Sequence, residues 1–303
     1  MDCEDVEVDV FERVRPRLFG IAYRMLGTVA EAEDVVQDAW LRWHGADQDA
    51  VAEPGAYLAT VVTRLSIAEL TSARARREVY VGPWLPEPVD TSADPLLGAE
   101  RAEALSFAVL VLLEKLSPAE RAAFVLHAAF DYPHARVAEV LATTEANARQ
   151  LFSRARRHLD DARPRPASPG DRDRLLAAFV AAAEAGDLSA LEQVLATDVT
   201  SISDGGGVVP AARKIVAGPE RVAHFLLGVL DKYGQGMSAR PMLLNGEPAV
   251  LALRPDGSPI AVWTVDAAAD GIHGVFLVLN PQKLSRFGGP PALSWGHHPK
   301  ERT

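Results

Sequence analysis

The stretch that decides the fold lies between residues 116 and 159. It begins Leu116-Ser-Pro-Ala-Glu-Arg-Ala-Ala-Phe-Val-Leu126 and ends Glu145-Ala-Asn-Ala-Arg-Gln-Leu-Phe-Ser-Arg-Ala-Arg-Arg-His-Leu159. Within it, Ser117-Pro-Ala-Glu120 is a capping box whose proline takes the first helical position. This signature predicts a helix that runs to about Phe130.

Two more helices are expected after it. Asp131-Tyr-Pro133 ends the first helix, a short helix covers residues 135–141, and Thr143-Thr144 caps a last helix through Leu159. A helix-turn-helix of this kind places its last helix in the major groove of DNA. The stretch therefore predicts a DNA-binding domain.

The last helix has an apolar side and a polar side. Leu151, Phe152, Ala155 and Leu159 are expected to face the core. An ordinary helical bundle with a basic exposed face is the alternative, and the agreement of turn spacing, caps and charge disfavours it. The polar side carries residue types that pair with base edges or phosphates. The candidate DNA-binding residues are Thr144, Glu145, Asn147, Arg149, Gln150, Ser153, Arg154, Arg156 and Arg157.

Composition and charge limit the possible classes of protein. The chain has 303 residues, of which 48% are hydrophobic, enough for two or three small domains. A net charge of −10 argues against a protein that coats nucleic acid indiscriminately, although arginines crowd between residues 149 and 165. Cys3 is the single cysteine, which excludes an intramolecular disulfide. The acidic N-terminus and the lack of a long apolar run predict a cytoplasmic protein.

The first 75 or so residues are predicted to be helical throughout. Apolar residues recur at spacings of three and four from Phe11 to Met25, and Gly27-Thr28 breaks that helix. A second helix is expected from about Glu31 to Trp43, and a third after Pro54. Three such helices can enclose one core.

Two proline-rich segments separate the helical parts from the rest. Residues 79–88 contain Trp84-Leu-Pro-Glu-Pro88 and predict an extended linker, part of which packs on something because it holds Trp84 and Leu85. Residues 163–170 predict a second linker. Beyond it, helices are expected at 171–185 and 188–195, before Val199-Thr-Ser-Ile-Ser203 and a glycine turn. A helix at 219–230 follows, and strands are expected at 249–253, 260–265 and 275–279. Helices followed by a run of antiparallel strands predict an α+β domain.

Both helical parts resemble a known family. Leu116–Leu126, Val137–Leu141 and Thr144–Arg157 closely resemble the sigma-4 domain of extracytoplasmic-function sigma-70 factors. Ala32-Glu-Asp-Val-Val-Gln-Asp-Ala-Trp-Leu-Arg-Trp43 resembles the sigma-2 helix that binds the clamp helices of the polymerase β′ subunit. The resemblance implies promoter DNA and core RNA polymerase, through its β′ clamp helices and β flap, as partners. It assigns core binding to Asp34, Gln37 and Asp38, which taken alone would be read as a solvated helix face.

By the same resemblance, sigma-4 reads the −35 element and the third helix engages the −10 element. Capture of single-stranded DNA needs cations along a groove and a pocket for an extruded base. Ala68, Glu69 and Thr71 depart from the family, in which an aspartate and basic residues are frequent there. The candidate −10 residues are Arg64, Ser72, Arg74, Arg76 and Arg77.

The resemblance extends to the SigJ-like subgroup, in which a C-terminal SnoaL-like domain follows sigma-4. It rests on Trp84-Leu-Pro-Glu-Pro88, Asp204-Gly-Gly-Gly207 and Asn280-Pro-Gln-Lys-Leu284, where Gln282 replaces the usual aspartate. The family comparison implies that this domain controls the sigma domains in cis, and we expect the first two motifs to lie near each other. The implied regulatory residues are Trp84, Leu85, Pro86, Glu87, Pro88, Asp204, Gly205, Gly206, Gly207, Asn280, Pro281, Lys283 and Leu284.

The expected fold is multidomain: two all-α sigma domains, the second with the helix-turn-helix, and an α+β SnoaL-like cone. The expected boundaries are 6–78 for sigma-2, 79–96 for the linker, 97–162 for sigma-4, 163–170 for the second linker and 171–288 for the SnoaL-like domain. The expected function is that of an alternative sigma factor that directs promoter-specific initiation of transcription.

Two other functions are alternatives to this one. SnoaL-like folds include enzymes, but Asp198, Asp204, His224, Asp266 and His273 suggest no acid–base pair, so we expect no catalysis, metal or cofactor. For aromatic residues such as Phe225, Trp263 and Phe276, simple core packing is favoured, and a pocket for a small apolar ligand is the alternative. A one-component ligand-sensing DNA-binding regulator is the main rival, and the clamp-binding helix argues against it.

Overall fold

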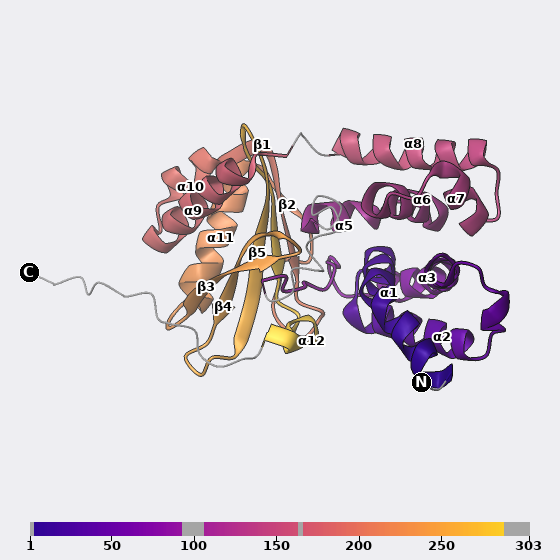
Figure 1. Cartoon of the computed structure of the whole chain (residues 1–303). Coiled ribbons are helices and arrows are strands. Elements are labelled where there is room, and N and C mark those ends of the chain that lie inside the picture. Colours follow the sequence, from indigo (N-terminus) through magenta and orange to yellow (C-terminus); the bar gives the residue numbers. More distant parts are fainter. Residues whose placement is uncertain (1–2, 93–105, 163–165, 288–303) are drawn as a thin grey trace, which may run out of the picture. The chain divides into compact units, whose positions relative to one another are not determined.

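The computed structural model describes residues 3–92, 106–162 and 166–287, and the side chains from residue 8 onward except those of residues 74, 75 and 78. Parts of the expected linkers (93–96 and 163–165), the expected start of sigma-4 (97–105) and residue 288 lie outside the described residues. The described residues divide into two units. Residues 3–80, 91–92 and 106–162 form the first, and residues 81–90 and 166–287 form the second (Figure 1).

Three helices form what we call the sigma-2-like block (residues 3–80). They are α1 (Cys3–Leu26), α2 (Val29–His44) and α3 (Pro54–Glu78), and a short 3-10 helix, η1 (Gln48–Ala50), precedes α3. The Thr28 hydroxyl accepts a hydrogen bond from the Glu31 N–H, so α2 starts at Val29, slightly earlier than predicted. The core of the block includes the buried side chains of Leu18, Ile21, Val36, Trp43, Leu58 and Val62.

The sigma-4-like block (residues 106–162) completes the first unit. It contains α5 (Phe107–Leu113), α6 (Pro118–Phe124), the π-helix η3 (Val125–Ala129), α7 (His134–Val140) and α8 (Glu145–Ala162). The capping box at Ser117 and Glu120 is formed in both directions. Asp131, with a φ of 58°, turns the chain from η3 toward α7. The predicted helix-turn-helix is therefore present.

The second unit packs helices against one face of a six-stranded sheet (Figure 1). The helices are α9 (Pro169–Ala185), α10 (Leu188–Val194) and α11 (Pro219–Tyr233). The strands, in the order of the sheet, are β2 (Val216–Ala217), β1 (Leu195–Asp204), β6 (Gly271–Val278), β5 (Pro259–Ala268), β4 (Glu247–Leu253) and β3 (Ser238–Leu244). Short helices α12 (Pro281–Leu284) and η4 (Ser285–Phe287) follow. The α+β prediction is confirmed.

The sheet differs from the prediction in three respects. Strands β3 to β6 are antiparallel as expected, but β1 pairs with β6 in parallel. Strand β3 was missed because it is an edge strand with Pro241 and exposed residues, which hide the alternating pattern. Strand β2 has only two residues and carries no pattern.

Among the described residues, no helix combines the length and the apolar character needed to cross a membrane.

Candidate nucleic-acid interface

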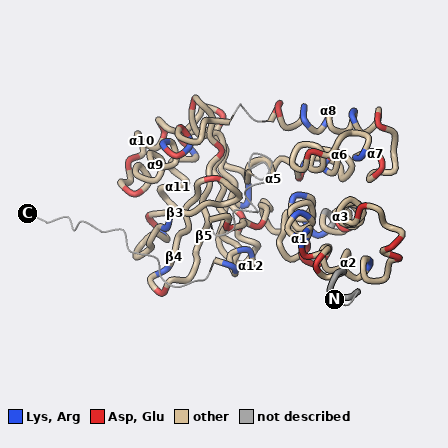
Figure 2. The backbone as a smooth tube through the Cα atoms, in the orientation of Figure 1, with Lys and Arg blue, Asp and Glu red and all other residues tan. Residues whose placement is uncertain are grey.

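Helix α8 has the two sides expected of it. Ala148, Leu151, Ala155 and Leu159 are buried, whereas Phe152 is only half-buried. The Thr144 hydroxyl accepts the Asn147 N–H at 3.2 Å and so caps the helix. Figure 2 shows basic residues along the helix. Asn147 is half-buried, and the other candidates are exposed: Thr144, Glu145, Arg149, Gln150, Ser153, Arg154, Arg156 and Arg157.

Carboxylates pair with three of the α8 arginines. Arg149 pairs with Glu145, Arg154 Nε lies 3.1 Å from Glu120 Oε1, and Arg156 Nε lies 3.5 Å from an Asp160 oxygen. Burial raises the pKa of Glu120, but hydrogen bonds from Ser117 and the positive charge of Arg154 lower it by more. The pKa of Glu120 is therefore lowered overall. Exposed pairs of this kind contribute at most about 1 kcal/mol, so a DNA phosphate can replace the carboxylate.

Stacked rings support the back of α8. The His127 and His134 rings are 4.1 Å apart, and His127 meets Phe152 edge-on at 4.5 Å. Burial, together with the positive charges of His127 and Arg149, lowers the pKa of His134. A neutral His134 suits this stack, since two imidazolium rings at that distance would repel each other.

Helix α2 presents a polar stripe opposite its buried side. Asp34, Gln37 and Asp38 are exposed, and all lie on one side of the helix. Leu41 continues the stripe one turn further and is 60% exposed, unusually high for a leucine. Sequence reasoning missed Leu41, although its spacing of three and seven residues from Asp38 and Asp34 could have identified it.

The described α3 cations, Arg64, Arg76 and Arg77, each contact different protein groups in this structure. Arg64 donates to the backbone oxygens of Val140 at 2.9 Å and Glu139 at 3.1 Å, both at the end of α7. Arg76 pairs with Glu31 and Glu69 and donates to the exposed Ser72 hydroxyl at 2.7 Å. The side chain of Arg74 lies outside the described residues.

Arg77 is the most enclosed of these cations. It pairs with Glu114, the residue that follows α5, and donates to the Leu26 oxygen. Burial lowers the pKa of its guanidinium, and Arg121 adds to that, against the opposing effect of Glu114. Arg77 therefore contacts protein groups on α3's neighbours in this structure.

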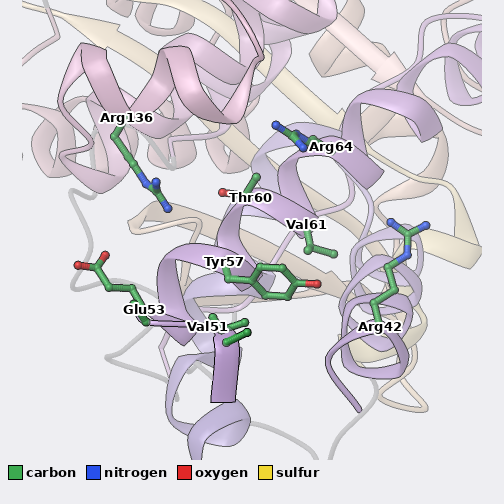
Figure 3. A pocket seen from close by; sticks show the side chains of 10 residues that line it. Arg42, Val51, Glu53, Tyr57, Thr60, Val61, Arg64 and Arg136 are labelled. Atoms are coloured by element: carbon green, nitrogen blue, oxygen red, sulfur yellow. The ribbon is translucent and has the colours of Figure 1, made fainter. Parts of the chain in front are cut away.

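A pocket of about 800 Å³ lies beside Arg64 in the first unit (Figure 3). Tyr57 forms part of its wall, and its ring lies 6.0 Å from that of Trp43. Arg136 of α7 also lines it, so both helical blocks contribute. The sequence prediction of a base pocket did not name Arg42, Tyr57 or Arg136. The full lining is Arg42, Ala50, Val51, Ala52, Glu53, Tyr57, Thr60, Val61, Arg64 and Arg136.

The three short motifs meet inside the second unit. Asp204 Oδ2 accepts the Leu85 N–H at 2.9 Å and lies 2.7 Å from Lys283 Nζ. Lys283 also donates to the Leu85 oxygen and lies 4.2 Å from the centre of the Trp84 ring. The side chain of Asp204 is fully buried and that of Lys283 is 9% exposed. We call this cluster of Trp84, Leu85, Asp204 and Lys283 the linker knot.

Glycines allow the backbone to approach closely beside the linker knot. Gly206 has a φ of 63°, and a Cβ there would overlap the Asn280 amide. Asn280 in turn donates its N–H to the Asp204 oxygen at 2.9 Å. Gln282, where the sequence departs from the subgroup, is exposed and donates its N–H to Asn280 Oδ1 at 3.0 Å. Its side chain therefore lies outside the buried cluster.

The segment expected to be a linker is part of the second unit. Leu85, Pro86, Glu87 and Pro88 are buried. Val89 and Asn245 exchange hydrogen bonds of 2.9 and 3.2 Å, and Asp90 forms an antiparallel bridge with Leu244 at the end of β3. Residues 81–90 thus pack on the C-terminal domain rather than acting as a free tether.

The polar candidates of the C-terminal domain are spread over several places. Asp204 belongs to the linker knot, and His224 is exposed on α11. His273 bridges two carboxylates: Nδ1 lies 2.6 Å from Asp198 and Nε2 lies 2.9 Å from Asp270. Burial lowers the pKa of His273, but the two carboxylates outweigh it and raise the pKa overall. Asp198 and Asp270 are about 70% exposed, so this cluster is a surface ion bridge.

The three aromatic residues proposed to line a pocket do not share one. Trp263 pairs with Leu277 and Thr264 with Phe276 across β5 and β6, so Trp263 and Phe276 point to opposite faces of the sheet. Trp263 joins the core under the helices, and Phe225 packs against that core. Neighbouring positions along a strand alternate between faces, so Trp263 and Phe276 do not line one pocket together. Trp263 and Phe225 instead show the simple core packing that the sequence favoured.

Comparison with known proteins agrees with this architecture. The family models for sigma-70 region 2 and sigma-70 region 4 match residues 10–76 and 106–159. The ECF RNA polymerase sigma factor SigJ of Mycobacterium tuberculosis is 47% identical over 298 residues, covering 92% of this chain and 94% of that protein. The probable sigma factor SigI of the same species is 32% identical over 276 residues, covering 89% and 92%.

A solved structure extends the likeness to the whole fold. The crystal structure of M. tuberculosis SigJ superposes with a TM-score of 0.77, at 38% identity over the structurally aligned residues, and covers 93% of this chain and 99% of that one. The likeness therefore spans both helical blocks and the C-terminal domain. The chain therefore belongs to the extracytoplasmic-function family of RNA polymerase sigma factors.

Proposed function

We propose that this sigma factor uses α8 to read −35 DNA, α3 and its pocket to engage the −10 element, and α2 to bind core polymerase, under control of the C-terminal domain. The observation that carries the proposal is that one chain combines an arginine-bearing helix-turn-helix with a separate, exposed acidic stripe. The two surfaces suit partners of opposite charge. Both are needed in a factor that brings a polymerase to DNA.

The −35 contacts are assigned to the exposed side of α8. Early residues of a recognition helix reach base edges, and later cations reach phosphates. Asn147, Arg149 and Gln150 are therefore proposed for base contacts, and Arg154, Arg156 and Arg157 for phosphates. Thr144, Glu145 and Ser153 complete the exposed surface.

The −10 contacts are assigned to α3 and the neighbouring pocket. An aromatic wall at Tyr57 can stack on an extruded base, and the guanidinium groups of Arg42 and Arg64 can hold the phosphates on either side. This pocket supports a role for Arg64. Ser72, Arg74, Arg76 and Arg77 lie further along α3 and are proposed for duplex or backbone contacts next to it.

Core polymerase is proposed to bind α2 through its β′ clamp helices, with Leu41 as an apolar anchor beside Asp34, Gln37 and Asp38. A small apolar contact framed by charges is a frequent arrangement at the centre of an interface. The β flap is proposed as the partner of the sigma-4-like block. Binding to polymerase would take place in the cytoplasm, where polymerase acts.

The C-terminal domain is proposed to regulate rather than catalyse, and the linker knot supports this. Residues 81–90 lead directly from α3, so the domain holds the chain at the end of a DNA-contacting helix. A tethered domain of this kind acts at high effective concentration. Of the other motif residues, Pro281 is exposed and Leu284 is buried.

Binding of a small molecule to the C-terminal domain is a separate proposal. It is tested by ligand-induced shifts in the thermal stability of the full chain.

Run-off transcription with purified core polymerase tests the proposal. The full chain is compared with a version that ends at Arg165, on promoters from its own upstream region. Promoter-dependent transcripts are expected, and the difference between the versions gives the sign of the regulation. Operator binding without core, combined with no transcript from either version, would instead indicate a one-component regulator.

A further inference from the structure

We infer that Thr143 fixes the side-chain amide of Asn147 so that α8 presents a hydrogen-bond acceptor, with which Asn147 binds the amino group of an adenine or cytosine at one −35 base pair. Asn147 determines specificity there, and Thr143 is its positioning residue. The inference rests on the proposed role of α8 and deepens it, because it names the class of base that one side chain reads.

The turn before α8 holds Thr143 in a defined place (Figure 1). Ala142 has a φ of 50°, so the chain leaves the helical path directly after α7. Ala142 donates its N–H to the Glu139 oxygen at 3.2 Å, and Thr143 donates its N–H to the Ala138 oxygen at 2.9 Å. Two backbone hydrogen bonds therefore tie the turn to the end of α7, and the Thr143 side chain is half-buried there.

Asn147 is held at two points in the first turn of α8. Its backbone N–H donates to the Thr144 hydroxyl at 3.2 Å, which fixes the start of the helix. Its side-chain Nδ2 donates to the Thr143 hydroxyl oxygen at 2.9 Å. The side chain of Asn147 is therefore ordered before DNA is bound, so little of its conformational entropy remains to be lost on binding.

The hydrogen bond to Thr143 sets the orientation of the amide. Because Nδ2 is turned toward Thr143, Oδ1 lies on the opposite side of the planar amide group. In the part of the chain that the structure describes, no group donates a hydrogen bond to this oxygen. Since early residues of a recognition helix reach base edges, Asn147 brings an acceptor to the major groove.

An acceptor at this place distinguishes two classes of base. In the major groove, adenine presents its N6 amino group and cytosine its N4 amino group, and both are donors. Guanine O6 and thymine O4 are acceptors. Asn147 Oδ1 can accept a hydrogen bond from either amino group, whereas it would meet the lone pairs of a keto oxygen with no proton between them. One such contact discriminates by about tenfold.

The test measures the affinity of holoenzyme for −35 duplexes of a promoter mapped by run-off transcription. Each base pair is first changed in turn, and Asn147→Ala identifies the one at which discrimination is lost. The amino group is then removed there, with purine in place of adenine or the analogue of cytosine that lacks it. Wild type is expected to lose about tenfold in affinity, and Asn147→Ala much less. Removal of the keto oxygen from the partner base should not distinguish the two proteins.

Thr143→Val tests the positioning role, because it keeps the shape of the side chain and removes the hydroxyl. The amide can then turn over and offer Nδ2 to a keto oxygen, so removal of the amino group should cost less than about threefold. Thr143→Ser keeps the hydroxyl and should restore the wild-type ratio. Thr197→Val, at an exposed threonine of the C-terminal domain, is the matched control. Each result is a ratio from one protein preparation, so partial unfolding of a variant cancels.

The outcomes separate this inference from the proposed function. If wild type depends on the keto oxygen at that base pair and not on the amino group, Asn147 acts as a donor and the inference is wrong. The full tenfold dependence in Thr143→Val would contradict the positioning role. If Asn147→Ala alters discrimination at no base pair of a −35 element that wild type selects, Asn147 reads no base, although α8 does. If wild-type holoenzyme shows no −35 selectivity, the proposed role of α8 is wrong and the inference falls with it.

Discussion

Lys283 Nζ lies 2.7 Å from Asp204 Oδ2, and the two side chains, 79 positions apart in the chain, are both buried. The pair is completed by Leu85, whose N–H and oxygen bind the same two groups. One buried ion pair therefore clamps a segment that leads out of α3 onto the sheet of the C-terminal domain. The regulatory proposal depends on this geometry.

Lys283→Met is expected to lower the free energy of unfolding of the C-terminal unit by about 3 kcal/mol, because it leaves the Asp204 carboxylate buried and unpaired. Asp204→Asn should restore part of that loss in the double variant. Denaturant unfolding followed by tryptophan fluorescence, which includes Trp84, measures both. Lys232→Met is the matched control, since Lys232 also lies over a ring, at 5.2 Å from that of Tyr233, but is exposed. A similar loss in the control would contradict the role of the knot.

Arg157→Ala is expected to weaken holoenzyme binding to −35 duplex DNA evenly across sequences. If the side chain contacts one phosphate, the slope of log affinity against log salt concentration should fall by about 0.9. Fluorescence anisotropy over a range of salt concentrations gives the slope. Arg174→Ala removes an exposed arginine from α9 and should leave the slope unchanged. An unchanged slope for Arg157→Ala would show that it does not contact the backbone.

Leu41→Ala is expected to weaken the association with core polymerase by about 1–2 kcal/mol, as loss of an apolar anchor does. Competition for core against a labelled sigma factor measures it. Val8→Ala, at a residue 46% exposed on α1, is the control for removing an exposed aliphatic side chain. Loss of −35 binding in the same variant would point instead to a folding defect.

The Asp198–His273–Asp270 bridge predicts a pH dependence of stability. The pKa of His273 is raised in the folded protein, so its contribution is complete below the ordinary histidine value of about 6.5 and is lost as the pH rises through the raised pKa. The difference in unfolding free energy between wild type and His273→Gln should therefore shrink as the pH rises from 5.5 to about 9. His224→Gln, at an exposed histidine of α11, should show no such trend. If the difference in unfolding free energy between wild type and His273→Gln does not change with pH, the bridge is not charged.

Local signals in the sequence were enough to predict the long helices and the helix-turn-helix. The Ser117–Glu120 capping box, the Pro54 helix start and the break at Gly27 each act within a few residues, where side chain and backbone decide the outcome together. Short motifs also located the regulatory segments. Their resemblance to a known family supplied the function, which periodicity alone could not.

Contacts between distant residues and the register of the strands could be read only from the tertiary structure. Leu85 and Asp204 are 119 positions apart, Arg64 and Val140 are 76 apart, and no local rule relates them. The parallel pairing of β1 with β6 and the opposite faces of Trp263 and Phe276 depend on strand register, which is set by the packing of the whole sheet. Spacing and capping residues therefore predict the long helices, but not the edge strands β2 and β3. The pairing of distant charges depends on the complete fold, because burial in a shared core, rather than spacing along the chain, selects their partners.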